Sequence, residues 1–127
     1  MGPIRNVILI AGLALTVSSC GSDSPSSPSG NDGTIAATLT ISGGSITPKT
    51  VTVPVGSRVT IVNNDSASHD MNSDPHPEHT QCPALNVGTL TSGQSRSSQN
   101  LTTARVCGMH VHLNPDNANL KATITVQ

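Results

Sequence analysis

Apolar and polar residues alternate along most of the chain, and this pattern predicts short β-strands. Residues 35–41 place Ile, Ala and Leu at the odd positions and Ala or Thr between them, the period-two pattern of a strand with one buried face. Residues 51–55, 59–62 and 120–126 repeat the alternation with Val, Ile, Leu and Ala. Helical periodicity is not seen in any long window.

Glycine, asparagine and proline separate these segments. Residues 43–44, 56–57, 63–65 and 114–117 carry turn residues, which punctuate a chain between strands. Pro48 confines residues 46–48 to an edge or a turn, because proline cannot donate to a central ladder.

Two later segments are weaker. Residues 94–101 are weakly strand-like, and residues 102–107 predict a short strand that leads into a loop. Many short strands joined by such turns predict an all-β sandwich in residues 34–127.

The N-terminal region has the features of a processed leader. Arg5 provides a positive charge and residues 7–17 form an apolar run too short to span a bilayer comfortably. The run ends at Cys20 in a pattern that resembles the lipobox of bacterial lipoproteins. We therefore expect residues 1–19 to be a lipoprotein signal peptide and residues 20–33 to be a lipidated cysteine and a flexible Ser, Pro and Gly linker. The protein would be held on the extracytoplasmic or periplasmic face of the bacterial cell envelope by lipid.

Composition argues against several functions. The chain has no Phe, Trp or Tyr, so it lacks the stacking platforms of proteins that bind single-stranded nucleic acids. Loss of the leader removes Arg5 and leaves a net charge of about −2, which is unfavourable for nucleic acid. We find no pairing of a nucleophile with a base, and we do not expect an enzyme.

One short segment combines the side chains of a metal site. Residues 107–112, Cys-Gly-Met-His-Val-His, hold a thiol at Cys107 and imidazoles at His110 and His112. Sulfur together with imidazole favours copper or zinc over hard cations. If the segment is extended, His110 and His112 point to the same side. A further imidazole, His69, follows a strand-like run far upstream.

The segment between these ligands adds further candidates. His76, His79 and Cys82 lie in a proline-rich loop and are weaker candidates for metal binding. Cys82 and Cys107 could instead form a disulfide, as paired cysteines in an oxidising compartment commonly do. One carboxylate of this region could orient a ligand imidazole; the candidates are Asp70, Asp74 and Glu78.

Taken together, residues 48–65, His69, the Cys107-x-x-His110 spacing and residues 120–126 resemble a cupredoxin, the blue copper family. The resemblance implies a Greek-key β-sandwich with copper at one end, bound by His69, Cys107 and His110. In this family a weak axial methionine usually precedes the last strand, and Leu120 stands there instead. His76, His79 and His112 are additional to the family pattern.

The resemblance leaves two functions open. A thiolate site would pass single electrons to a redox partner in the envelope. A Cys82–Cys107 disulfide would instead leave an all-imidazole site built from His69, His110 and His112, with His76 or His79 as further candidates. Such a site is better suited to copper storage, resistance or delivery through a copper-exchange partner. A metal-free interaction module is the third alternative.

Overall fold

The computed structural model describes residues 33–127. The expected signal peptide, Cys20 and almost all of the expected linker lie outside the described residues. The described residues form nine strands, with these bounds: β1 (Ile35–Ser42), β2 (Ser45–Thr47), β3 (Thr50–Val53), β4 (Arg58–Asn63), β5 (His69–Ser73), β6 (Gly88–Leu90), β7 (Ser95–Ser97), β8 (Arg105–Val111) and β9 (Lys121–Val126).

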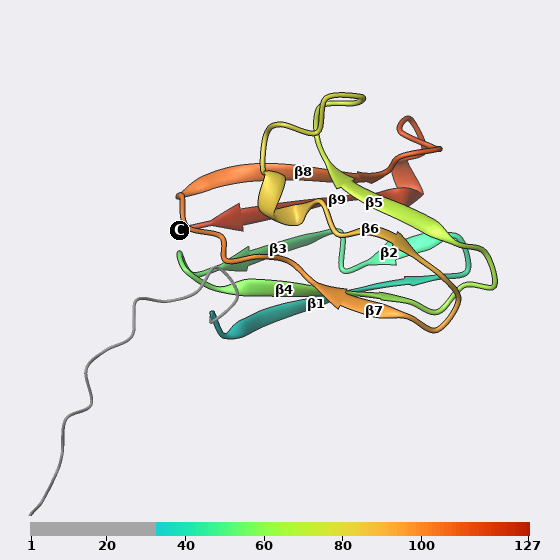
Figure 1. Cartoon of the computed structure of the whole chain (residues 1–127), viewed down its shortest axis with the longest axis horizontal. Coiled ribbons are helices and arrows are strands. Elements are labelled where there is room, and N and C mark those ends of the chain that lie inside the picture. The colour runs from blue at the N-terminus through green and yellow to red at the C-terminus, as the bar shows by residue number, and fades with distance from the viewer. Residues whose placement is uncertain (1–32) are drawn as a thin grey trace, which may run out of the picture.

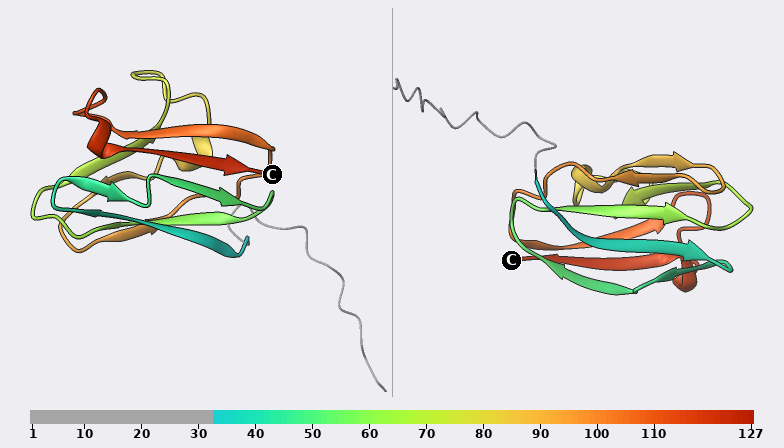
Figure 2. Two further views of the ribbon diagram at one scale, coloured as in Figure 1. Left: turned by 180° about the vertical axis from the view of Figure 1, so that it is seen from behind. Right: turned by 90° about the horizontal axis from the view of Figure 1, so that it is seen from below.

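The strands form two mixed sheets packed face to face, in agreement with the expected all-β sandwich. One sheet has the order β2-β1-β4-β7 and the other has the order β3-β9-β8-β5-β6. Strands β1 and β4 pair in parallel, as do β3 and β9, and the other pairs are antiparallel. Figure 1 and Figure 2 show β8 and β9 in one layer and β1 and β4 in the other.

The core between the sheets is aliphatic. Strand β4 alternates half-buried and buried residues along its length, and β9 does the same, as expected from the period-two pattern. Because the chain has no Phe, Trp or Tyr, this space is filled by Leu, Ile, Val, Met and the paired cysteines. The largest fully buried aliphatic side chains include Leu39, Ile41, Ile61, Leu85 and Ile124.

The sequence pattern was less accurate at the sheet margins. Ile35 and Val55 are largely exposed, although the alternation predicts inward positions for both. The weak segment 94–101 contains only the short strand β7, which pairs with β4. Residues 46–48 overlap the edge strand β2, as the proline suggested.

Two three-residue 3₁₀ helices complete the described chain, η1 (Pro83–Leu85) and η2 (Ala118–Leu120). Within residues 33–127, no helix is both long enough and apolar enough to cross a membrane. The segment between β5 and η1 rises above the layer that contains β8 and β9 (Figure 1). We call residues 74–82 the covering loop.

Candidate metal centre

Strand β8 presents its side chains to two opposite sides of the sheet. Cys107, Met109 and Val111 are buried with the core residues between the sheets. Successive side chains of a strand point to opposite faces, so His110 lies on the outer face. The sequence predicted that the strand ends at Cys107, but β8 continues through Val111. This extra length decides which side chains can meet.

The covering loop lies over the outer face of β8 and is fixed there by hydrogen bonds. The Asp74 amide donates to the Gly108 carbonyl at 3.0 Å, and the Gly108 amide donates to Gln81 Oε1 at 2.8 Å. Within the loop, the Gln81 amide donates to the Asp74 carbonyl at 2.8 Å. The loop therefore carries His76 and His79 back over the strand that carries His110.

Four imidazoles meet beneath this loop. One ring nitrogen from each of His76, His79, His110 and His112 lies within 4.8 Å of the others. The loop supplies the first two rings, and β8 and the residue that follows it supply the other two. We call these four residues the imidazole cluster. Among the described residues, no aspartate, glutamate or cysteine belongs to it.

His110 is the most buried member of the imidazole cluster. Its side chain is 1% exposed, and Nδ1 lies 2.6 Å from Asp74 Oδ1. A carboxylate only accepts, so Nδ1 carries the proton and Nε2 of the neutral ring has a free lone pair. Nε2 is buried and has no hydrogen-bond partner. A buried polar atom without a hydrogen-bond partner is uncommon in proteins, and a bound ion is one explanation for it.

Gly108 makes the contact between Asp74 and His110 possible. A Cβ atom at position 108 would lie 1.9 Å from Asp74 Oδ2, so any other residue there would displace the carboxylate. Only glycine lets the carboxylate settle over the strand beside His110. The sequence offered Asp74 as one of three carboxylates that could orient an imidazole, but it gave no reason to single out Gly108.

His79 is oriented in the same way as His110, by a different acceptor. Its Nδ1 donates to the Ser73 carbonyl at 2.8 Å, which leaves Nε2 as the acceptor. Nε2 lies 2.8 Å from Nδ1 of His112. The backbone of His79 has a φ of 54°, in the left-handed region that residues other than glycine adopt infrequently. Such outliers concentrate at functional sites.

His76 is the exposed member of the imidazole cluster. Its ring centroid lies 4.7 Å from that of His112 and 5.5 Å from that of His110. Desolvation of the ring lowers the pKa of His76 below 6.5, and charge repulsion from His112, His110 and His79 lowers it further. The ring therefore stays neutral, and able to bind a metal ion, to a lower pH than an isolated histidine.

The donor set fits a first-row transition metal. Metal-bound imidazole nitrogens lie about 2.0–2.1 Å from the metal, and the four nitrogens are already grouped within 4.8 Å. Metal-bound histidines usually donate their second N–H to a carboxylate or a carbonyl, as His110 and His79 do here. Four imidazole nitrogens suit copper, zinc or nickel better than magnesium or calcium.

Cys82 and Cys107 do not contribute ligands, because their sulfurs form a disulfide with a Cα–Cα distance of 5.9 Å. The expectation of a thiolate ligand at Cys107, and of a weaker one at Cys82, is therefore wrong for this state. The reason is that β8 continues past Cys107 to Val111. Cys107 and His110 are three residues apart on this strand, so their side chains face opposite sides of the sheet. The alternative expectation of a Cys82–Cys107 disulfide agrees with the structure. The all-imidazole site expected with it included His69, however, and His69 is not among the four grouped rings.

His69 lies outside the imidazole cluster. It shares the inward face of β5 with Met71 and Ser73, whereas the cluster is on the outer face of the sheet. Its Nε2 lies 2.9 Å from Asp65 Oδ2, and Asp65 in turn accepts from the Gly44 amide. The structure thus does not unite His69 with Cys107 and His110 as the resemblance implied.

The remaining sulfur candidates belong to the core. Met71 and Met109 are fully buried between the sheets, and Leu120 is buried near them. Leu120 follows the turn before β9 and has no metal-binding atom. Leu120, at the position that the family pattern gives to an axial ligand, is part of the buried core, whereas the candidate centre lies on the outer face of the sheet.

Comparisons with known proteins address the fold. No protein-family model and no curated protein sequence matches the chain. A purple cupredoxin from Nitrosopumilus maritimus is 22% identical with a TM-score of 0.58, and the match covers 72% of this chain and 99% of that one. The oxidised plastocyanin from Dryopteris crassirhizoma is 17% identical with a TM-score of 0.54, covering 71% of this chain and 99% of that one.

An enzyme also contains this fold. The copper-containing nitrite reductase from Thermus scotoductus is 23% identical with a TM-score of 0.53, and the match covers 72% of this chain but only 22% of the reductase. The fold alone therefore does not separate small copper proteins from enzyme domains. At these identities the comparisons establish architecture, and residues 33–127 form a domain with the cupredoxin fold.

Proposed function

We propose that this domain is a copper-handling protein that holds one Cu(II) ion in the imidazole cluster for storage, resistance or delivery. The observation that carries the proposal is the buried Nε2 of His110, which has no partner in the described chain and belongs to the group of four ring nitrogens. Among divalent first-row metals, Cu(II) binds nitrogen sites most tightly.

The disulfide favours copper handling over fast electron transfer by a thiolate site. With both sulfurs in the Cys82–Cys107 bond, the donors are nitrogens alone. Such a site lacks the thiolate-to-copper charge transfer that gives blue copper proteins their intense colour. The copper protein would therefore be pale, with nitrogen ligands only.

Electron transfer through the same four rings is the second candidate. Two features support it: hydrogen bonds fix the rings of His110 and His79, and the disulfide ties the covering loop to β8. A rigid ligand set would change little between Cu(I) and Cu(II). A reversible voltammogram with fast electron exchange between the copper site and the electrode would favour this role. A much higher affinity for one copper oxidation state than for the other would favour storage or delivery.

Copper titration of the metal-free full-length protein tests the proposal. We expect one Cu(II) per chain in competition with a chelator, weaker Zn(II) binding, and an electron paramagnetic resonance spectrum showing coupling to several nitrogens. An intense visible band from thiolate would contradict the nitrogen-only site. Absence of tight uptake of either metal would overturn the proposal altogether and favour an interaction module.

Attachment to the bacterial envelope is part of the same proposal. The lipobox-like sequence that ends at Cys20 supports a lipid anchor, and a disulfide is typical of proteins that leave the reducing cytoplasm. A copper-exchange or redox partner would then be another envelope protein. Incorporation of labelled fatty acid into the protein, lost in Cys20→Ser, is the expected result; equal labelling of both forms would contradict it.

A further inference from the structure

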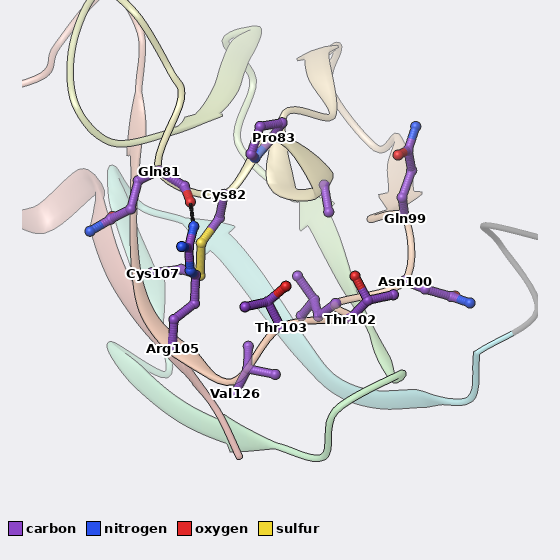
Figure 3. A pocket seen from close by; sticks show the side chains of 12 residues that line it. Gln81, Cys82, Pro83, Gln99, Asn100, Thr102, Thr103, Arg105, Cys107 and Val126 are labelled. Atoms are coloured by element: carbon purple, nitrogen blue, oxygen red, sulfur yellow. Dashed lines mark hydrogen bonds between the residues drawn. A yellow bond between two sulfur atoms is a disulfide. The ribbon is translucent and has the colours of Figure 1, made fainter.

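A pocket of about 260 Å³ reaches the disulfide, and its lining includes both cysteines but no residue of the imidazole cluster. Figure 3 shows Gln81, Cys82 and Arg105 at one side of this pocket and Thr103 and Val126 at another. Both cysteines line it, although Cys82 is only 5% exposed and Cys107 only 1% exposed. The bond is therefore shielded by the fold except where this pocket reaches it.

The charge in the pocket suits thiol chemistry. Arg105 lines the pocket and lies two residues before Cys107 on β8, so their side chains share a face. A guanidinium near a sulfur stabilises the thiolate form. Cleavage of a disulfide is faster when the departing sulfur is a stabilised thiolate. The guanidinium donates to the Gln81 carbonyl, next to Cys82 in the sequence. The site thus has access for a thiol and a positive charge in the same lining as the two cysteines.

The disulfide also joins the two halves of the imidazole cluster. Cys82 ends the covering loop, which carries His76 and His79, and Cys107 lies on β8 shortly before His110. Gln81 is next to Cys82. Its side-chain oxygen accepts a hydrogen bond from the Gly108 backbone amide, and its own backbone amide donates to the Asp74 carbonyl. Asp74 then holds His110. A short chain of contacts therefore links the sulfur bond to the buried ring.

We propose that a dithiol reductant reaches Cys82–Cys107 through this pocket, and that reduction loosens the covering loop and weakens metal binding by the imidazole cluster. This inference rests on the copper-handling function proposed above. The redox state of the disulfide would then regulate metal binding: the oxidised protein would hold the metal ion, and the reduced protein would release it.

The reaction balances without a further reagent. One thiolate of the dithiol attacks Sγ of Cys82, the Cys82–Cys107 bond breaks, and Sγ of Cys107 leaves as a thiolate that takes up a proton. The second thiol of the reductant loses its proton and displaces Cys82, which is protonated in turn. Two electrons pass to the protein, and the reductant becomes a disulfide.

The first experiment tests access and needs no metal. Reduction of the full-length Cys20→Ser protein by dithiothreitol is followed by alkylation and mass spectrometry. Thr103→Trp, which places a large side chain in the pocket lining, should slow reduction several-fold. Thr91→Trp, at an exposed position outside the pocket, should leave the rate unchanged. Equal rates in all three proteins would overturn the proposed route.

The second experiment tests loosening of the covering loop, also without metal. Hydrogen exchange in residues 74–82 should become faster after reduction of the native cysteines, while exchange in β4 and β9 stays slow. Unchanged exchange in the loop would overturn the coupling. Because this measurement uses the native chain, it remains decisive if cysteine variants fail to fold.

The third experiment measures the coupling itself. Cys82→Ala/Cys107→Ala in the Cys20→Ser protein has no thiol that could bind metal, so its Cu(II) affinity reports on the imidazoles alone. We expect a loss between about 5- and 150-fold, the range typical of coupled sites. Equal affinity would overturn the inference while leaving the copper-handling function intact. Absence of Cu(II) binding by the oxidised parent protein would overturn both, and with them the release of metal on reduction.

Discussion

The protein contains two histidine–aspartate pairs that use the same chemistry for different ends. His69 Nε2 meets Asp65 Oδ2 at 2.9 Å, and His110 Nδ1 meets Asp74 Oδ1 at 2.6 Å. The first pair joins a turn to the Gly44 backbone and lies apart from the other imidazoles. The second leaves a buried ring nitrogen without a partner, next to three more rings.

The difference between the pairs lies in what surrounds the second ring nitrogen. A carboxylate beside a histidine is found in structural turns as well as in metal sites, so the pair alone does not indicate function. A converging group of four ring nitrogens does. The covering loop brings two of the four rings to β8, whereas His69 lies outside that group. Variants that treat the two pairs alike should therefore give different results.

The largest expected effect separates the two histidines directly. His110→Ala should lower Cu(II) affinity by about 100-fold or more, because it removes a ligand, whereas loss of an outer partner alone costs about 10- to 100-fold. His69→Ala should change the affinity little. Competition titration measures both. Equal losses would mean that the metal ion sits elsewhere, nearer to the arrangement that the family resemblance implied.

A second pair of variants compares the carboxylates. Asp74→Ala should lower Cu(II) affinity by about 10- to 100-fold, as expected for an outer partner that orients a ligand. Asp65→Ala serves as the matched control and should affect folding stability more than metal affinity. If Asp65→Ala weakened copper binding as much as Asp74→Ala, the two pairs would not have separate roles.

Gly108→Ala should act through Asp74. The new Cβ would collide with the carboxylate, so we expect a loss of Cu(II) affinity about as large as that of Asp74→Ala, roughly 10-fold or more. Adding Gly108→Ala to Asp74→Ala should then produce little further change, since contacting residues are not additive. Fully additive losses in this cycle would contradict the proposed clash.

The smallest effect concerns acid stability at the first pair. Burial opposes ionisation of Asp65, but the hydrogen bonds from His69 and Gly44 outweigh it, and the pKa of Asp65 lies below 3.8. Below about pH 3.8 the unfolded chain therefore binds more protons at this group, and stability falls as the pH is lowered. Asp65→Asn should flatten that part of the curve in chemical denaturation at pH 2–5. An unchanged slope would exclude Asp65 as its source.

The disulfide and the aliphatic core bear on all these measurements. Closing the 25-residue separation between Cys82 and Cys107 contributes about 3–4 kcal/mol in the chain-entropy view. A domain with no aromatic residue has correspondingly less apolar area to bury. Metal titrations of cysteine variants should therefore be accompanied by a check of folding by circular dichroism.

Local pattern was sufficient for much of the architecture. The alternation in β4 and β9 follows from the period of an extended chain, and the turn residues at 43–44 and 114–117 separate elements where expected. The pairing of His110 with His112 on one side of an extended segment also follows from that period. These features depend on neighbours in sequence, which is why they could be predicted without knowing the fold.

What only the tertiary structure decided is which of the five histidines and two core-domain cysteines meet. Continuation of β8 past Cys107 turned the thiol inward and His110 outward, and the return of the covering loop then brought His76 and His79 to the outer face. Neither event is encoded in local periodicity, because each depends on contacts between segments about thirty residues apart. Gly108 and Asp74 acquire their roles only where those segments touch.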